Sequence, residues 1–504
     1  MGKTGRQDIE EVCKGKHVII YGAGKGIGQF LEQYGHKVTL EAVIDNDRCK
    51  QGKKIGDIFS EAFQTKFADV QICSPGILSQ YVPENVVVFV ASAKRHREIE
   101  EDLQQKGLSN IYIISEMDFV QEHADVEKAL LRYQEYCVSL PIVSNKILFS
   151  SFANYADHEK YISESLMKLR TDLDIVWLVS DLDVELPDGV RKVLRGNWKK
   201  VLYEAETSRM WIADTAVPAF FVKRPEQIYM QTKHWASITL KKFYLDAITF
   251  QNESEKLASW RRESEIIDYI VVGSEFDKES CKRGFGVNGE FIMAGSPRTD
   301  GLFRGKQNRE KVYAYYELAD DMRVLMYAPT YRFSKEAGKS VHQSREIGFD
   351  YCQIKAVLEK RFGGSWKIAL RLHPSVRDAA KEMELPDFVF DVSTYEDSEE
   401  LVSAFDIMVS DYSSLMFEPA FIKRPVFLYA ADLEEYLVNE YELLISYKEL
   451  PFDIAENTEQ LRANILNFDK SEYEKRVEIF LDKYGIKEDG HASERVAEFI
   501  SALL

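Results

Sequence analysis

This sequence has no C-x-x-C pair and no long apolar run, and we expect no signal peptide from its first residues. Its six cysteines are scattered, with no C-x-x-C spacing and no cluster with histidine, a pattern typical of small buried side chains in a reducing compartment. Apolar runs such as 86–91 have the length of a strand, and residues 1–12 lack the apolar core of a leader. We therefore expect a cytoplasmic protein without disulfides, a structural zinc site or a membrane-spanning helix.

Basic charge is also scarce. The chain has 65 lysines and arginines against 83 acidic residues, a net charge of -18. Such a field repels nucleic acid, so we expect no nucleic-acid partner, and any phosphate must be bound by locally placed basic side chains. The hydrophobic fraction of 45% is that of an ordinary globular protein, and 504 residues are too many for one core. Two or three domains are expected.

Strands and helices alternate along most of the chain, which predicts an α/β fold built on parallel sheets. The alternation restarts twice, after a charged helical stretch and again near residue 323. We expect a Rossmann-like nucleotide-binding-type domain at 1–120, a helical linker at 121–144, and α/β domains at 145–305 and 306–504. The expected strands include 200–204, 269–272 and 426–429, and Ser493 is expected to begin the last helix.

The first domain opens with an apolar strand at 17–21, a glycine-rich turn and a helix expected at 29–34, the usual start of a βαβ unit. The dinucleotide fingerprint is incomplete, because Ile27 occupies the place of its third glycine, although an acid lies about 20 residues on, where a ribose ligand is expected. A bound nucleotide and a purely structural role both stay open for this domain. The candidate nucleotide-binding residues are Gly22, Gly24, Gly28 and Asp45.

Short polar clusters follow several expected strands of the later domains, and the carboxyl ends of strands line the ligand crevice in doubly wound folds. His234 follows a strand at 227–231, and Lys241 lies a few residues further on. Histidine is the side chain best suited to accept a proton near neutral pH, so His234 is a candidate general base. A packing or surface histidine is the alternative.

Two arginines, each just past a proline, come next. Arg298 lies in the cluster 295–300 together with Asp300, and Arg332 closes the cluster 328–332. An arginine fork suits phosphate oxygens, which makes both arginines candidate phosphate ligands. The alternative for each is a surface salt bridge.

Two further clusters complete the series. Strand alternation would place Arg371 and His373 on one face, just before a proline. The run 410–414 lies between a strand and a helix, where hydroxyls and free backbone N–H groups form an anion site; simple N-capping by Ser413 is compatible with it. The candidates from this run are Ser410, Asp411, Ser413 and Ser414.

Taken in order, these five clusters resemble the CDP-glycerol glycerophosphotransferase family, the teichoic-acid primases and polymerases. The resemblance covers roughly residues 200–440. It implies a GT-B fold, in which two Rossmann-like domains face each other across a donor cleft. It also implies CDP-glycerol or a similar CDP-polyol as donor, a polymeric or lipid-linked acceptor, no obligatory cofactor, and contact with the inner face of the membrane. We expect no protein-bound metal.

The resemblance also assigns roles. It implies that His234 is the general base on the acceptor hydroxyl, that Arg371 and His373 lie near the donor pyrophosphate, and that the serines at 410–414 bind phosphate. Arg298 and Arg332 belong to motifs that line the same cleft. One departure stands out, because the family's H-G-T-P-L-K is here two residues longer and without its glycine and proline (234–241). The acceptor and the exact polyol therefore stay open.

Other functions are compatible with these residues. A glycosyltransferase on the same frame would use a nucleotide sugar and release a nucleoside diphosphate. A nicotinamide-dependent enzyme or sensor would use the first domain, although the imperfect fingerprint is evidence against it. For membrane contact, the basic stretch 191–200 with Trp198 is the candidate surface; a solvated basic edge is the alternative.

Overall fold

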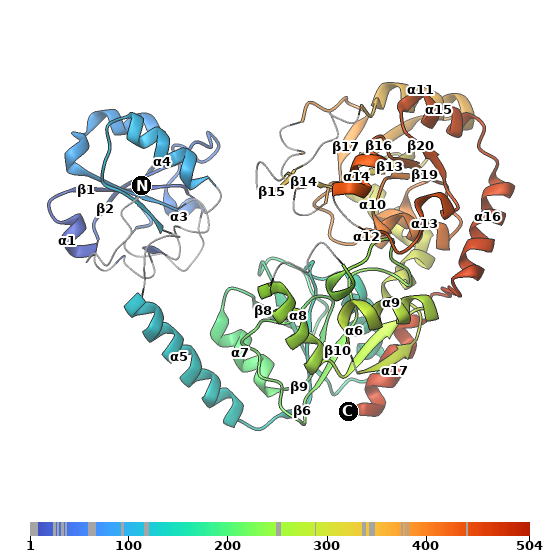
Figure 1. Ribbon diagram of the computed structural model, residues 1–504, viewed down its shortest axis with the longest axis horizontal. Coiled ribbons are helices and arrows are strands. Elements are labelled where there is room, and N and C mark those ends of the chain that lie inside the picture. Colours follow the sequence, from blue (N-terminus) through green and yellow to red (C-terminus); the bar gives the residue numbers. More distant parts are fainter. Residues whose placement is uncertain are drawn as a thin grey trace. The chain divides into compact units, whose positions relative to one another are not determined.

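The computed structural model describes most of the chain, which forms two compact units, Met1–Ala129 and Leu130–Leu504 (Figure 1). Helix α5 (Val120–Ser139) contains the boundary between them. The described residues are 9–23, 27, 30, 31, 35, 38–58, 67–91, 95–114, 120–247, 254–287, 289–334, 339–341, 348–373, 376, 377, 380, 383–439 and 442–504.

The first unit is built on a five-stranded parallel sheet of order β3-β2-β1-β4-β5. Its strands are β1 (His17–Tyr21), β2 (Leu40–Ile44), β3 (Ile72–Cys73), β4 (Val86–Val90) and β5 (Ile111–Ile113). Its described helices are α1 (Ile9–Cys13), α3 (Ile55–Ile58), η1 (Pro75–Gln80), η2 (Pro83–Asn85) and α4 (His96–Gln105). The apolar run at 86–90 is fully buried, as in parallel strands that are covered on both faces. This strand order is that of a Rossmann-like domain, as the sequence predicts.

The second unit contains two α/β lobes. The part built on a seven-stranded parallel sheet, order β12-β11-β10-β9-β6-β7-β8, is called the first lobe here. Its strands are β6 (Val143–Ser150), β7 (Asp174–Val179), β8 (Arg191–Leu194), β9 (Ser208–Ala213), β10 (Ile228–Gln231), β11 (Tyr269–Val272) and β12 (Glu290–Met293). Its described helices are α6 (Asp157–Leu169), α7 (Trp198–Thr207), η4 (Tyr244–Asp246), α8 (Ser254–Ile266), α9 (Glu275–Phe285) and η6 (Pro297–Arg304).

The second lobe is built on a six-stranded parallel sheet of order β17-β16-β13-β18-β19-β20, with a small antiparallel hairpin. Its strands are β13 (Arg323–Ala328), β16 (Trp366–Leu370), β17 (Val389–Asp391), β18 (Ile407–Ser410), β19 (Val426–Tyr429) and β20 (Asp453–Ala455); the hairpin is β14 (Arg332–Ser334) and β15 (Lys339–Val341). The described helices are α10 (Gly305–Tyr315), α11 (Tyr351–Phe362), α12 (Ser398–Ala404), η8 (Ser414–Met416), α13 (Phe417–Phe421), α14 (Leu433–Asn439), η9 (Tyr447–Glu449), α15 (Thr458–Leu466), α16 (Lys470–Lys483) and α17 (Ala492–Leu503).

Both lobes are doubly wound, so each sheet has a switch point where the strand order reverses. The switch point lies between β6 and β9 in the first lobe, and between β13 and β18 in the second. The serine run 410–414 and the cluster 328–332 both leave the sheet at the second switch point. The sequence-based domain boundary at 305/306 stays a prediction.

The last helix returns to the first lobe. Figure 1 shows α17 beside the elements of the first lobe, and its residues Val496, Ala497 and Ile500 are buried in the same hydrophobic cluster as Ile147 and Trp177. The helix starts at Ala492 and not at Ser493, so the expected capping by Ser493 is wrong. The cap comes from far away in the sequence, because the Asp300 carboxylate accepts hydrogen bonds from the N–H groups of Ala492 (3.0 Å) and Ser493 (2.7 Å).

Removal of this cap tests the attachment of α17. Asp300→Ala should lower the free energy of unfolding by about 1–2 kcal/mol, because two backbone N–H groups at a buried helix start lose their acceptor. Urea denaturation followed by circular dichroism measures the change. Asp300→Asn is the control, since its amide oxygen still accepts one bond and most of the stability should be kept. An alanine variant as stable as the parent would show that the cap contributes nothing.

One expected strand is wrong. Residues 200–204 lie within helix α7, where Asn197 caps the helix by accepting from the N–H of Lys200 (3.2 Å). Val201, Leu202 and Ala205 are buried, and their spacing is that of one helical face. The edge strand β8 was not predicted, because in its four residues Val193 alone is buried.

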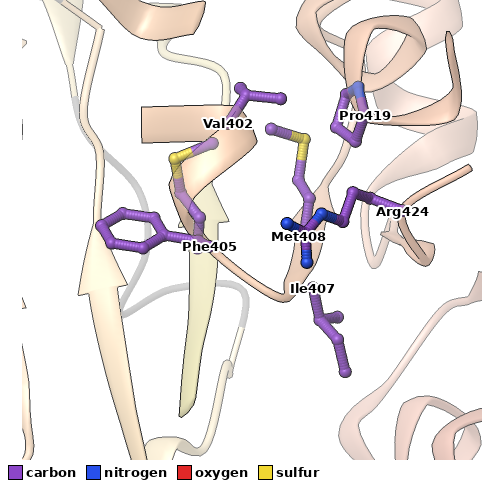
Figure 2. A pocket seen from close by; sticks show the side chains of 7 residues that line it. Val402, Phe405, Ile407, Met408, Pro419 and Arg424 are labelled. Atoms are coloured by element: carbon purple, nitrogen blue, oxygen red, sulfur yellow. The ribbon is translucent and has the colours of Figure 1, made fainter. Parts of the chain in front are cut away.

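A cavity of about 10 Å³ lies in the core of the second lobe (Figure 2). It is lined by Met326, Val402, Phe405, Ile407, Met408, Pro419 and Arg424. Such a volume holds one water molecule at most, so this cavity is a packing defect and not a substrate site. The candidate site lies elsewhere, at the strand ends.

Candidate active site

His234 lies just beyond the end of β10, in the segment 229–240. Every residue of this segment is buried except His234 itself, which is exposed. The backbone on both sides of the histidine is therefore held in the protein interior, while the imidazole is presented to solvent at the carboxyl edge of the sheet. A group that must meet a substrate needs this placement.

The surroundings of His234 keep its imidazole neutral. Protein on several sides takes the exposed ring partly out of bulk water, and this desolvation is the largest cause that lowers its pKa from 6.5 to about 4. The positive charges of Arg298 and, more weakly, Lys233 lower the pKa further, while a hydrogen bond with the Asp214 backbone opposes them. A neutral imidazole at physiological pH can accept a proton.

His373 approaches the same place from the second lobe, just beyond the end of β16. Burial is the largest cause that lowers its pKa from 6.5 to about 4, and the nearby charges of Lys241, His234 and Arg371 contribute to the same lowering. Its ring lies 4.5 Å from the ring of Tyr331, centroid to centroid. The electrostatic coupling means that His234 and Lys241 of the first lobe and His373 of the second lie close together. The structure thus brings together the two predicted histidines and the predicted lysine.

The serine run meets the histidine segment directly. The hydroxyl of Ser414 accepts from the N–H of Leu240 (3.1 Å) and lies 3.0 Å from the Thr239 hydroxyl. Ser413 caps η8, since its hydroxyl accepts from the N–H of Leu415 (3.3 Å), as the sequence predicts. Ser410 is buried and donates to the Ala328 carbonyl (2.8 Å) across the switch point. Ser413 and Ser414 are therefore at the junction of the lobes, and Ser410 ties the strands beneath it.

Arg298 is buried and bonded to protein groups. Its guanidinium forms ion pairs with Asp157 (2.8 Å), Glu399 (2.5 Å) and Glu418 (3.1 Å), and it donates to the His234 carbonyl (3.0 Å). Arg298 therefore forms salt bridges, as in the alternative interpretation given above, but they lie in the protein interior and not on its surface. Arg298 supports the backbone of His234 from behind, and a direct substrate contact stays a prediction.

Arg332 and Asp411 form a second buried group. Arg332 pairs with Asp432 (2.7 Å) and Asp411 (3.2 Å), and Asp411 also accepts from the N–H of Thr330 (2.8 Å). Its guanidinium lies over the ring of Tyr412, with the Cζ atom 4.9 Å from the centroid. These bonds hold the loops that leave β13 and β18. Substrate contacts of Arg332 and Asp411 stay predictions.

Arg371 and His373 differ in their surroundings. Arg371 follows β16 with its side chain enclosed, and it donates to the carbonyls of Val392 (3.1 Å) and Tyr395 (3.0 Å). Desolvation by burial lowers its pKa below the ordinary value. Asp300, as described above, caps α17. Roles of Arg371 and Asp300 as substrate ligands therefore remain predictions, without support from their contacts.

Several polar residues around His234 were not singled out in the sequence. Asp157 and His158 open α6, Asp214 follows β9, and Lys233 precedes the histidine. The position of Asp214 after a strand was a usable signal. The residues at the start of α6 carried no local signal, because the fold alone brings them to the site.

In the first unit, the candidate acid is already bonded. The Asp45 carboxylate accepts from the N–H of Ala23 (2.7 Å) and pairs with Lys50 (3.3 Å). Gly22 has a φ of 111°, which favours glycine. Gly24 and Gly28, like most of the helix expected at 29–34, lie outside the described residues. Nucleotide binding at this turn stays a prediction.

The described residues contain no group of three or more His, Cys, Asp or Glu side chains arranged to hold a metal ion. Across the same part of the chain, no helix combines the length and the apolar character needed to span a membrane.

The basic stretch 191–200 is largely engaged within the protein. Arg191 pairs with Asp174 and Glu204, and Lys192 donates to the carbonyls of Leu182 and Val184. These bonds hold Arg191 and Lys192 to the edge of the sheet, and contact of this stretch with a membrane stays a prediction.

Sequence comparison places this geometry among known proteins. Residues 133–502 match the family model of CDP-glycerol:poly(glycerophosphate) glycerophosphotransferase. The chain is 30% identical over 371 residues to a teichoic acid glycerol-phosphate transferase of Staphylococcus aureus, covering 71% of this chain and 92% of that protein. It is 28% identical over 368 residues to a teichoic acid poly(glycerol phosphate) polymerase of Staphylococcus epidermidis, covering 70% of this chain but only half of that protein.

Structural comparison agrees with the sequence. The structure of the wall teichoic acid polymerase TagF superposes with a TM-score of 0.65 at 25% identity, covering 76% of this chain and 97% of that one. This similarity confirms the expected GT-B architecture. The family match spans both lobes and includes all five polar clusters. The chain belongs to the CDP-glycerol:poly(glycerophosphate) glycerophosphotransferase family.

Proposed function

We propose that the chain transfers glycerol phosphate, or a related polyol phosphate, from a CDP-polyol to a hydroxyl of a cell-surface polymer and releases CMP. The observation that carries this proposal is the meeting of His234 and Lys241 with His373 and the Ser414 hydroxyl at the strand ends of the two lobes. A proton acceptor, a cation and anion-binding groups are the parts that phosphoryl transfer requires.

In the proposed reaction, the acceptor hydroxyl oxygen forms a bond to the β-phosphorus of the donor. The bond from this phosphorus to the bridging oxygen breaks, and CMP leaves with that oxygen. His234 takes the proton of the attacking hydroxyl. Lys241 and His373, together with the hydroxyls of Ser413 and Ser414, stabilise the charge on the phosphate oxygens, so that positioning and electrostatics supply most of the catalysis.

The electrostatics of the site suit a phosphate donor. Desolvation and the cations Arg298 and Lys233 hold the pKa of His234 at about 4. A bound pyrophosphate brings negative charge close to the imidazole and raises its pKa, which makes the histidine a stronger base when the donor is in place. The site is thus neutral at His234 before binding and becomes more basic on binding.

For the acceptor, the proposal names a class of molecule and not a single compound. A polymeric or lipid-linked hydroxyl is the acceptor, and the enzyme works on the cytoplasmic side with peripheral contact to the membrane. The S. aureus and S. epidermidis relatives named above, a teichoic acid glycerol-phosphate transferase and polymerase, support a polymer acceptor.

Nucleotide release tests the proposal. Purified protein is incubated with CDP-glycerol, CDP-ribitol and a panel of nucleotide sugars, with a glycerol-phosphate oligomer as acceptor. We expect CMP release together with lengthening of the oligomer, measured by chromatography and mass spectrometry. Release of a nucleoside diphosphate from a sugar donor would instead identify a glycosyltransferase and overturn the proposed reaction.

A further inference from the structure

The residue before His234 has an unusual conformation and environment. Lys233 has a φ of 61°, in the left-handed region that side chains other than glycine rarely adopt. It is 1% exposed, although lysine is almost never fully buried unless it is paired. The strained backbone and the buried charge each cost free energy. Contacts with the surrounding structure must therefore stabilise this conformation.

The partners of the Lys233 ammonium explain how it is held. Its Nζ atom donates to the carbonyls of Trp235 (3.1 Å) and Ala236 (2.9 Å) and pairs with the Asp277 carboxylate of α9 at 3.2 Å. The side chain thus folds back over the two residues that follow the histidine. A left-handed residue at 233 is what allows the chain to turn back so sharply.

Asp277 is itself fixed. Its carboxylate is buried and accepts from the N–H of Gly273 (3.0 Å) and from the indole N–H of Trp235 (3.3 Å). The ammonium therefore meets an acceptor whose position does not depend on Lys233 alone, and the loop is anchored to the N-terminal turn of α9.

Three consecutive carbonyls of the loop are turned inward to buried groups. The carbonyl of His234 accepts from Arg298 (3.0 Å) and that of Ala236 from Lys233. The carbonyl of Trp235 accepts from Lys233 and lies 3.0 Å from Nε2 of His158. With the backbone held inward at all three residues, the His234 side chain is the one directed to solvent.

We infer that Lys233 is a positioning residue, whose buried ammonium closes the loop on itself and thereby aims the His234 imidazole at the substrate. This inference rests on the proposed function. Lys233 contributes through geometry and through electrostatics, because the same ammonium places a fixed positive charge beside the histidine. No substrate contact of Lys233 is involved, since its side chain is fully buried.

Lys233→Met tests the inference, since methionine keeps much of the apolar stem and removes the charge. We expect kcat for CMP release to fall on the order of 100-fold, the cost of a misplaced catalytic group, with little change in KM for the donor. The loop then lacks the two carbonyl bonds, and Asp277 lacks its cation.

The pH profile separates positioning from a purely structural role. His234 must be neutral to accept a proton, so activity falls as the pH drops through its pKa. The charged or protonatable groups that interact electrostatically with this imidazole are Arg298, Lys233, His373 and His158, and the Asp214 backbone forms a hydrogen bond with it. Loss of the Lys233 charge removes one of the causes that lower this pKa, so the acid limb of kcat/KM should move to higher pH.

The controls keep the test interpretable. Lys223→Met removes a lysine that precedes β10 and pairs with Asp268 at 3.0 Å, and it should leave kcat and the acid limb unchanged. Lys233→Met/Asp277→Asn removes both buried charges, so it should recover stability but not turnover. A single variant with parental kcat and an unmoved acid limb would overturn the inference.

A measurement without turnover separates this inference from the proposed function. The rate at which diethyl pyrocarbonate modifies His234, read by peptide mass spectrometry against pH, reports the pKa of the imidazole directly. Lys233→Met should shift this titration upward even if no donor is turned over. An unshifted titration would overturn the inference, whereas an inactive parent with a shifted titration would overturn only the function.

Discussion

Replacing His234 with alanine should lower CMP release from CDP-glycerol about 1,000-fold, within the range that a general base contributes. The imidazole is the exposed group of an otherwise buried segment, and the backbone around it is held by Arg298 and Lys233. Its removal therefore leaves the loop in place and deletes the proton acceptor. Steady-state kinetics with a glycerol-phosphate oligomer as acceptor measure the effect.

The control for this variant is His17→Ala, an exposed histidine of the first unit that bonds to Glu41. It should keep full activity. The pH dependence gives a second check, because the pKa of about 4 for His234 predicts that kcat/KM is flat around neutrality and falls only well below pH 6. A His234→Ala protein that retains a tenth of the parental rate would rule out the assigned base.

Replacing Arg298 with methionine should lower the free energy of unfolding by about 3–5 kcal/mol, the usual cost of removing one partner of a buried ion pair. Asp157, Glu399 and Glu418 all lie within 3.1 Å of this guanidinium. Without it, these buried carboxylates lose their ion pair, and the His234 carbonyl also loses its donor. Chemical denaturation measures the loss.

The loss should depend on pH with a definite sign. Burial already raises the pKa of Glu418 well above 4.5 and raises that of Asp157, and removal of the arginine raises both further. A carboxyl whose folded-state pKa is raised binds more protons in the folded state, so stability falls as the pH rises through that interval. Arg298→Met should therefore be closer to the parent at pH 5 than at pH 7.5.

Arg304→Met is the matched control, because Arg304 lies in the same helix η6 but pairs with Glu164 (3.1 Å) where both side chains are partly exposed. Such a pair contributes about 0–1 kcal/mol. Equal destabilisation by the two variants, or a loss at Arg298 that does not change with pH, would contradict the assignment of a buried charge cluster.

Strand positions were predictable because parallel strands are buried on both faces and read as short apolar runs. The runs at 269–272 and 426–429 match β11 and β19 to the residue. The failures are local and have physical causes. The short apolar pattern at 200–204 predicts a strand, whereas these residues form part of the amphipathic helix α7. The cap of α17 is Asp300, which no local pattern around Ser493 reveals.

Within the candidate site, the sequence indicated which residues converge but not how each is used. His234, Lys241 and His373 meet because they follow strands of two sheets whose carboxyl ends adjoin. The partners of Arg298 lie at positions 157, 399 and 418, and pairings over such distances depend on the tertiary fold. An arginine just past a strand end can bind phosphate or form ion pairs that hold a neighbouring segment, and the local sequence does not distinguish these two roles.

The return of α17 to the first lobe has a consequence for synthesis of the protein on the ribosome. Val496, Ala497 and Ile500 belong to the core of a lobe whose strands begin at Val143. Translation from residue 306 to 491 takes roughly 10–40 s at the usual elongation rates, and during this time the apolar face that receives α17 stays uncovered. The first lobe to be made is therefore the last to be completed, and chaperones have that interval in which to bind it.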